Sequence, residues 1–241
     1  MSERLDPLFA FEEVTVESDG RRIVGPVSAT IPDRGVSVLV GPSGSGKSTL
    51  LRLCNRLEIP SAGRVRFRGD DIGSLDPLAL RRRVGMVFQA PTPFAGSVRD
   101  NLLVAAPNAD ERRQLDSLRH ADLEQSFLDR DAGALSGGEA QRMCLARTMI
   151  TEPEVLLMDE PTASLDVDHR LVLERQACVL AQAGVPVIWV THDLDQVRRV
   201  GDMVLLVEEG RVTASGSAAG VLDERRQAAG TATVEGAADG G

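Results

Sequence analysis

One stretch, GPSGSGKST at residues 41–49, limits what this chain can fold into more than any other. It follows an apolar run with β character, Val36 to Val40, and leads into a run with helical character, Leu50 to Leu57. A strand, a glycine-rich turn and a helix in this order are the context that a phosphate-binding loop requires. An ordinary turn between a strand and a helix needs neither the lysine nor the hydroxyl, so the stretch predicts nucleotide binding.

Each residue type in this loop has a physical task. Gly44 and Gly46 leave room for backbone N–H groups to surround an anion, and the helix that begins near Lys47 points its positive end at the phosphates. Lys47 would reach the β- and γ-phosphates, and the Ser48 hydroxyl would bind Mg²⁺. The residues expected to bind nucleotide here are Gly41, Pro42, Ser43, Gly44, Ser45, Gly46, Lys47, Ser48 and Thr49.

Composition excludes several classes of protein. The chain has 241 residues, 42% of them apolar, and its 27 basic and 36 acidic residues give a net charge of −9. Without a basic stripe, duplex DNA is not expected as a partner. Three scattered cysteines are typical of reduced core residues in a cytoplasmic protein. No apolar run approaches the ~20 residues that span a bilayer, and no signal peptide is expected at the N-terminus. Another chain would have to bring this one to a membrane.

The pattern of apolar runs predicts an α/β fold with a mixed, largely parallel core sheet and an antiparallel β subdomain at its edge. The expected strands span residues 9–16, 21–31, 36–40, 64–68, 84–88, 155–158, 187–191 and 203–207. The main expected helices span residues 50–57, 78–83, 137–151 and 169–183, with a shorter one from 194. We expect an ATPase core at 1–89 and 135–215, a helical insertion at 90–134 and a flexible tail at 216–241.

Two acids follow the predicted strand Val155 to Met158. Because the carboxyl ends of parallel strands face the ligand crevice, Asp159 and Glu160 should emerge beside the phosphate loop. Asp159 would hold Mg²⁺, directly or through water, and Glu160 would polarise the attacking water. Acids at a strand end are also common as solvent-facing residues, but the phosphate loop favours the catalytic interpretation.

A second anion site is expected at Ser136–Glu139, where a helix begins. Ser136 is a natural N-cap, and Gly137 and Gly138 expose their N–H groups at the N-terminus of the helix. The first loop already surrounds the phosphates of one nucleotide. The second site is therefore expected to contact the γ-phosphate of a nucleotide held by another subunit.

The ordered set of motifs resembles the nucleotide-binding subunits of ABC transporters over about residues 9–212. The set consists of the phosphate loop, Gln89, LSGGEAQR at 135–142, LLMDEP at 156–161, SLD at 164–166 and THD at 191–193. The resemblance implies an ATPase that uses ATP and Mg²⁺ and forms a head-to-tail dimer with a second copy or a homologous subunit. It also implies a transmembrane permease as partner, and a peripheral location on the inner face of the cell membrane.

The resemblance also assigns roles to matching residues. Gln89 would contact Mg²⁺ and the membrane partner, and Ser136–Glu139 would close on ATP across the dimer. Asp166 would communicate between the two sites, and His192 would touch the γ-phosphate. His120 and His169 lack such a context and are expected to be surface residues. The catalytic set is then Glu160, His192, Lys47 and Gln89.

One departure from the family concerns the nucleobase. The family usually stacks adenine on an aromatic residue near Glu17 or Ser18, but this chain has no tyrosine, and Phe9 and Phe11 come too early. We expect base binding to rest on Val24 and on the stem of Arg21 or Arg22. Discrimination between ATP and GTP should therefore be weak.

The transported substrate stays open at this point. Phe88–Phe94 and Ser97–Asn101 are similar to phosphate-importer ATPases, whereas the short insertion and Glu139, in place of a glutamine, differ from them. The compact form is also similar to small ATPases proposed for metal (iron) efflux. A regulator that uses the ATPase without transport is an alternative. A chromosome-maintenance ATPase is disfavoured, because the gap between the motifs holds no heptads and no cysteine cluster.

Overall fold

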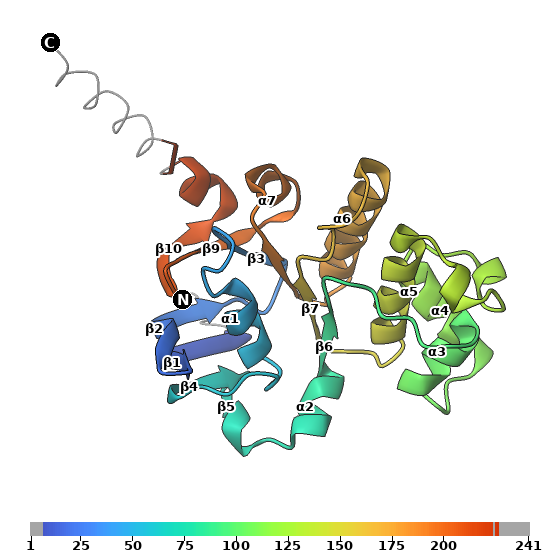
Figure 1. Cartoon of the computed structure of the whole chain (residues 1–241), viewed down its shortest axis with the longest axis horizontal. Helices are drawn as coiled ribbons and strands as arrows, with labels where there is room; N and C mark the ends of the chain where they lie inside the picture. The colour runs from blue at the N-terminus through green and yellow to red at the C-terminus, as the bar shows by residue number, and fades with distance from the viewer. Residues whose placement is uncertain (1–6, 224, 227–241) are drawn as a thin grey trace, which may run out of the picture.

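The computed structural model describes residues 7–223, 225 and 226, and its centre is a six-stranded sheet (Figure 1). The strand order is β10 (Arg211–Ser217), β9 (Met203–Glu208), β3 (Val36–Val40), β8 (Val187–Thr191), β7 (Val155–Asp159) and β6 (Val84–Val87). Neighbours from β9 to β6 are parallel, and β10 pairs antiparallel with β9. The parallel strands therefore all end at one edge of the sheet, and the mixed α/β fold is as predicted.

The central strands have continuous apolar sequences because both faces of the sheet are covered by other elements. Every residue of β3, β7 and β8 is buried. Alternate residues enter two different hydrophobic cores: Val38 and Val40 lie in one, and Leu39 in the other. α6 (Val167–Gln182) and α7 (Leu194–Val200) contribute to the first core, and α1 (Lys47–Leu53) contributes to the second.

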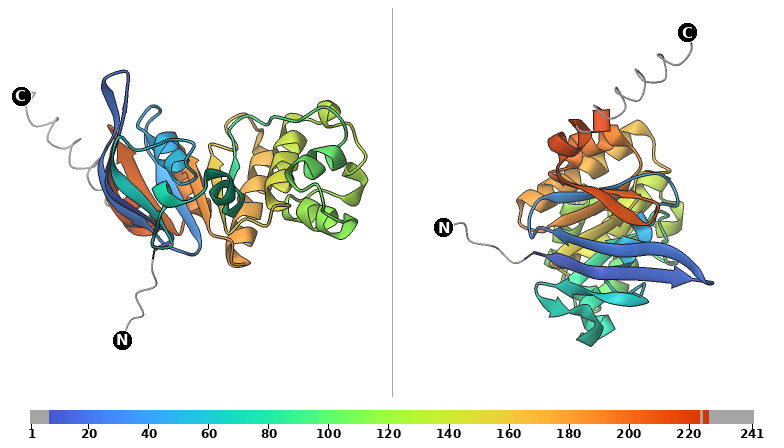
Figure 2. Two further views of the ribbon diagram at one scale, coloured as in Figure 1. Left: turned by 90° about the horizontal axis from the view of Figure 1, so that it is seen from below. Right: turned by 90° about the vertical axis from the view of Figure 1, so that its left-hand side faces the viewer.

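The second core is shared with the predicted antiparallel β subdomain (Figure 2). Its strand order is β2 (Arg21–Ile31), β1 (Phe9–Ser18), β4 (Ala62–Phe67) and β5 (Asp70–Asp71). The rings of Phe9 and Phe67 stack with centroids 5.0 Å apart. A short 3₁₀ turn, Ile72–Ser74, and α2 (Pro77–Arg83) lead back to β6. This packing places α1, and the loop before it, between the two sheets.

The region after β6 is helical, as expected from its leucines. It holds α3 (Val98–Ala105), α4 (Glu111–His120) and two 3₁₀ turns, Gln125–Phe127 and Ala132–Ala134, which pack near α5 (Gly137–Met149). Leu118 and Leu123 are buried in the same hydrophobic core as Val38 of the sheet. Because no separate core distinguishes residues 90–134, their treatment as a subdomain stays a proposal.

The C-terminal region differs from the prediction. The flexible tail was expected from residue 216, but Gly216 and Ser217 pair with Val204 and Met203 in β10. A helical turn at 218–223 then buries Val221 and Leu222. β10 escaped prediction because an edge strand with one exposed face carries little apolar signal. Most of the expected tail, 227–241, and the charged N-terminus at 1–6 lie outside the described residues. No helix in the described part is both long enough and apolar enough to cross a bilayer.

Candidate active site

Four predicted site segments leave the sheet at the same edge. β3, β8, β7 and β6 are consecutive neighbours and run parallel. They lead into Gly41 of the phosphate loop, His192, Glu160 and the segment of Gln89, respectively. In an open parallel sheet this edge is where ligands bind. The strand order therefore brings together residues that are far apart in the sequence (Figure 1).

The phosphate loop is held in a conformation that only glycine adopts easily. Gly44 and Gly46 have left-handed backbones with φ of +77° and +98°, and a Cβ on Gly41 would lie 1.9 Å from the carbonyl oxygen of Val207. Lys47 folds back over the loop, and its Nζ donates to the carbonyl oxygens of Gly41 (2.9 Å) and Pro42 (2.6 Å). Burial lowers the pKa of Lys47, and the nearby carboxylates of Glu160 and Asp159 oppose this shift. The ammonium group therefore lies at the loop, and its contact with a phosphate stays a prediction.

The unpredicted hairpin between β9 and β10 also touches this loop. Gly210 N donates to Ser45 O at 3.0 Å, and Gly25 N donates to Gly210 O at 2.7 Å. A cavity of about 570 Å³ lies between the loop and this hairpin, lined by Ser43 and Arg211 among others. The sequence signal for the hairpin was the turn pair Glu209-Gly210, which begins two residues after the end of the predicted strand at 203–207.

The predicted metal ligands lie next to each other. Ser48 Oγ donates to Asp159 Oδ1 at 2.6 Å, and Asp159 is only 3% exposed. A hydroxyl and a carboxylate oxygen, completed by phosphate oxygens, form the kind of donor set that Mg²⁺ uses in nucleotide sites. Arg52 Nη2 contacts the other carboxylate oxygen of Asp159 at 3.1 Å, and this contact was not predicted from the sequence. The i,i+4 spacing of Ser48 and Arg52 on α1 places them on one helix face and was the available signal.

Glu160 and His192 form the centre of the expected chemistry. Glu160 Oε2 lies 3.3 Å from His192 Nδ1, and the two side chains are 19% and 58% exposed. The backbone of Glu160 is left-handed, with φ of +43°, a conformation that costs a non-glycine residue about 1 kcal/mol or more. Both residues line a cavity of about 90 Å³, which is room enough for a water molecule.

The second predicted anion site begins α5, and its side chains are largely used for capping. Glu139 N donates to Ser136 Oγ at 3.3 Å, and Ser136 N donates to Glu139 Oε2 at 2.8 Å. The Ser136 N–H, together with the Arg130 guanidinium, lowers the pKa of the Glu139 carboxyl. Ser136 and Gly137 are exposed, and α5 lies apart from α1 of the same chain (Figure 1).

Asp166 and His169 connect this site to α6. Asp166 is the N-cap of α6, and His169 Nδ1 lies 2.8 Å from both of its carboxylate oxygens. A Cβ on Gly138 would lie 2.2 Å from Cδ2 of His169. His169 was expected to be an ordinary surface residue, but it is half-buried next to Gly138.

Gln89 lies two residues beyond the end of β6 and is exposed. Its chain segment is tied to α5, because Gln141 Nε2 donates to Phe88 O at 2.8 Å. Gln141 itself is fully buried. The structure therefore links the Gln89 segment to the helix that begins with Ser136–Gly138.

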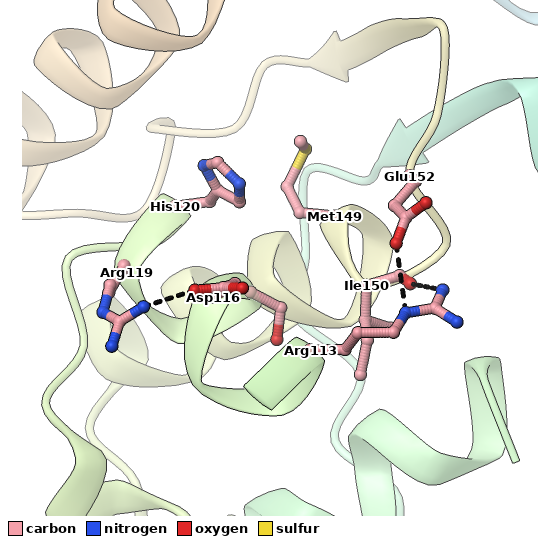
Figure 3. Close-up of a pocket in the computed structure, with 8 residues that line it drawn as sticks. Arg113, Asp116, Arg119, His120, Met149, Ile150 and Glu152 are labelled. Atoms are coloured by element: carbon pink, nitrogen blue, oxygen red, sulfur yellow. Dashed lines mark hydrogen bonds and ion pairs between the residues drawn. The ribbon is translucent and has the colours of Figure 1, made fainter. Parts of the chain in front are cut away.

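A different cavity, of about 420 Å³, lies between α4 and the C-terminal end of α5 (Figure 3). Its charged side chains are paired with one another: Arg113 Nε contacts Glu152 Oε1 at 3.0 Å, and Arg119 pairs with Asp116. His120, which lines it, is exposed as predicted. The cavity lies in the helical region away from α1 (Figure 1), and it forms no part of the nucleotide site.

Comparison with known proteins agrees with this geometry. Residues 24–163 match the family model for "ABC transporter". The chain is 42% identical over 214 residues to ABC transporter I family member 17 of Arabidopsis thaliana, covering 86% of this chain and 81% of the relative. It is 36% identical to the phosphate import ATP-binding protein PstB of Parasynechococcus marenigrum (strain WH8102), covering 91% and 85%.

Among solved structures, cbiO1 from Clostridium perfringens, part of the ABC transporter complex cbiONQ, superimposes with a TM-score of 0.84 at 30% identity, covering 91% of this chain and 92% of that one. The sequence-based resemblance is thereby confirmed. This chain belongs to the ABC transporter family, as an ATP-binding subunit with ATPase activity.

Proposed function

We propose that this subunit hydrolyses ATP between two copies, or between one copy and a homologous subunit, in a head-to-tail dimer. Lys47 binds the phosphates, and Ser48 and Asp159 hold Mg²⁺, which supplies positive charge at the phosphates when bound. Glu160 accepts a proton from the attacking water. His192 and Gln89 lie on the γ-phosphate side of the nucleotide, where His192 contacts the γ-phosphate. The nucleotide is covered by residues of the other copy, Ser136, Gly137 and Gly138, whose conformation Glu139 fixes. Asp166 lies at the interface between the copies.

The observation that supports the dimer is the exposed start of α5. The N–H groups at the start of a 13-residue helix favour an anion, and Ser136 and Gly137 are exposed on a helix that lies apart from α1 of the same chain (Figure 2). A single chain therefore presents two separate anion-binding surfaces. One nucleotide can use both only if the second surface comes from another copy.

The dimer is tested with Glu160→Gln, in which the carboxylate can no longer accept a proton but the side-chain shape is retained. This variant should bind ATP, lose at least about 100-fold in hydrolysis, and double its mass in size-exclusion chromatography with light scattering when ATP and Mg²⁺ are added. Adding Ser136→Arg should keep ATP binding but prevent the dimer. A protein that stays monomeric at saturating ATP, or turns over normally, would contradict the proposal.

We further propose that a separate transmembrane permease docks near the Gln89 segment, holding the subunit at the inner face of the cell membrane. A cavity of about 270 Å³ beside this segment is lined by Phe88, Phe94 and Val104, which are 47%, 48% and 61% exposed. Exposed apolar side chains gathered around a cavity are typical of a protein-binding surface. Movement of the dimer could be passed to the permease through this surface, because Gln141 ties it to α5.

Phosphate import is the transport function that the comparisons favour, since several relatives are phosphate import ATP-binding proteins. We propose phosphate rather than a metal ion such as iron as the transported substrate. The test is to purify this subunit with the membrane protein that it captures when both are produced in a native host. In vesicles, inorganic phosphate uptake should require ATP and should fail with Glu160→Gln. ATP-dependent transport of Fe²⁺ without transport of phosphate would show that the substrate is a metal ion and not phosphate. A membrane complex that transports neither would favour the alternative in which the ATPase regulates a membrane complex without transport.

A further inference from the structure

A buried polar network centred on Gln196 lies behind the Glu160–His192 pair. The side-chain amide of Gln196, on α7, accepts from Trp189 Nε1 of β8 at 2.9 Å. It also donates to Thr162 Oγ1 at 3.0 Å and to Glu174 Oε1 of α6 at 2.7 Å. Arg199 completes the network, with Nε 2.7 Å from Glu174 Oε2.

Four members of the network are almost completely buried, while the Arg199 side chain is 39% exposed. Gln196 is 2% exposed, Glu174 3%, Thr162 6% and Trp189 0%. Because the indole N–H can only donate, the amide oxygen of Gln196 must face Trp189, which directs both amide hydrogens to Thr162 and Glu174. A single orientation satisfies all partners, and a buried polar group that loses its partner is costly. Gln196 is therefore held rigidly between three elements.

The side-chain amide of Gln196 is hydrogen-bonded to residues close in sequence to Glu160 and His192. Thr162 comes two residues after Glu160, and Trp189 comes three residues before His192. Gln196 and Thr162 also line the cavity of about 90 Å³ in which Glu160 and His192 face each other. Glu160 Oε2 and His192 Nδ1 lie 3.3 Å apart in the lining of this cavity, so Gln196 is hydrogen-bonded to the segment behind each of them.

We propose that Gln196 is a positioning residue for ATP hydrolysis, which sets the distance between Glu160 and His192 through Thr162 and Trp189. This inference rests on the roles of Glu160 and His192 in the proposed function. It requires that damage to the network lower the rate of hydrolysis while leaving nucleotide binding at the phosphate loop intact.

The central variant is Gln196→Met, which keeps the length of the side chain and removes all three hydrogen bonds. We expect kcat to fall at least about tenfold, the effect of one lost positioning hydrogen bond worth about 1.4 kcal/mol, with the Kd for ATP within about twofold of wild type. Its matched control is Gln114→Met. Gln114 is a buried glutamine on α4 with bonds to Arg99 and Ala109, so this change should lower the Tm but leave kcat unchanged.

A second pair of variants covers the case in which Gln196→Met fails to fold. Thr162→Val replaces the hydroxyl with a methyl group of similar size, and Thr162→Ser keeps the hydroxyl. Thr162→Val should lower kcat, and Thr162→Ser should restore most of the loss. Equal rates for the two variants would mean that the hydroxyl does not position Glu160, and would overturn the proposal.

A double-mutant cycle separates positioning from general destabilisation. Trp189→Phe removes the indole N–H and should lower kcat, but in a His192→Ala background it should have no further effect on single-turnover hydrolysis, because the group it positions is gone. An undiminished loss in that background overturns the network proposal alone. Normal turnover in Glu160→Gln and His192→Ala would instead refute the catalytic roles themselves, so the two failures are distinguishable.

Discussion

Replacing Gly138 with alanine should destabilise the protein for a reason that is visible in one contact. The new Cβ would lie 2.2 Å from Cδ2, 2.4 Å from Cγ and 2.9 Å from Cβ of His169, far inside an ordinary carbon–carbon contact of about 3.5 Å. Rotation of the His169 ring would not relieve this contact. Its Nδ1 is held 2.8 Å from both carboxylate oxygens of Asp166, and the Cβ of His169, which does not move when the ring rotates, is itself one of the close atoms. The first turn of α6 must therefore shift.

The magnitude follows from two opposing effects. Overpacking of this kind costs about 1–3 kcal/mol, and glycine to alanine in a helix returns about 0.5–1 kcal/mol. The net loss of unfolding free energy is at most about 2.5 kcal/mol, or a Tm lower by up to about 10 °C for a chain of this size. In a His169→Ala background the ring is absent, so only the helix term remains and the same change should raise the Tm by about 1–4 °C.

The assay is thermal unfolding of the nucleotide-free protein, followed by circular dichroism or calorimetry. Gly137→Ala is the matched control, because it changes the preceding residue of the same helix and its Cβ would meet nothing within 4 Å. It should not destabilise either background. If Gly138→Ala shifts the Tm equally with and without the His169 ring, the steric argument is wrong.

Four other experiments, three of them on variants, test the rest of the site. Lys47→Ala should weaken ATP binding at least about tenfold, measured by calorimetric titration; an unchanged Kd would count against the phosphate-loop assignment. Titration with ATP and GTP should give dissociation constants within about tenfold, because the described aromatic side chains leave the β1–β2 turn without a stacking ring; a large preference for ATP would show that another group reads the base. Arg52→Met should lower stability by about 1–2 kcal/mol in urea unfolding, since it removes the guanidinium that pairs with the buried Asp159 carboxylate; an unchanged midpoint would mean that the pair contributes nothing. The lowered pKa of Glu139 means that its cap stabilises above the ordinary carboxyl pKa and is lost as pH falls through the lowered value, so the Tm difference between wild type and Glu139→Gln should shrink in acid, and a difference that grows would reverse the sign.

The motifs could be predicted because each depends on residue types at short spacing. The loop containing Lys47, the strand ending at Asp159 and the cap at Ser136 all combine a local periodicity with a side chain of specific chemistry. Their elements appear in the structure within a few residues of the predicted ends. The strand order could be inferred only in outline, since the parallel arrangement follows from buried apolar runs but the neighbours of β3 do not.

The missed features are contacts between distant segments. The sequence around His169 does not indicate that its ring will lie on Gly138. Gln196 lies on a seven-residue helix and looks like an ordinary polar residue in the sequence, because only the fold brings Trp189 and Glu174 next to it. β10 has alternating exposure and is specified by pairing with β9 rather than by its own hydrophobicity. Such features depend on tertiary packing, which overrides local preference.

The first turn of α6 shows how the motifs act together. Asp166 caps it, His169 contacts Gly138 at the start of α5, and Arg170 Nη1 lies 3.9 Å from Asp193, next to His192. Packed elements of this kind move as units, because a close-packed interior does not deform continuously. A second subunit that displaced Ser136–Gly138 would therefore also displace the first turn of α6, and through this turn the segment that contains His192. In the proposed function the phosphate loop binds the nucleotide, and the contacts of α6 connect that proposed site to the surface at which another copy would close.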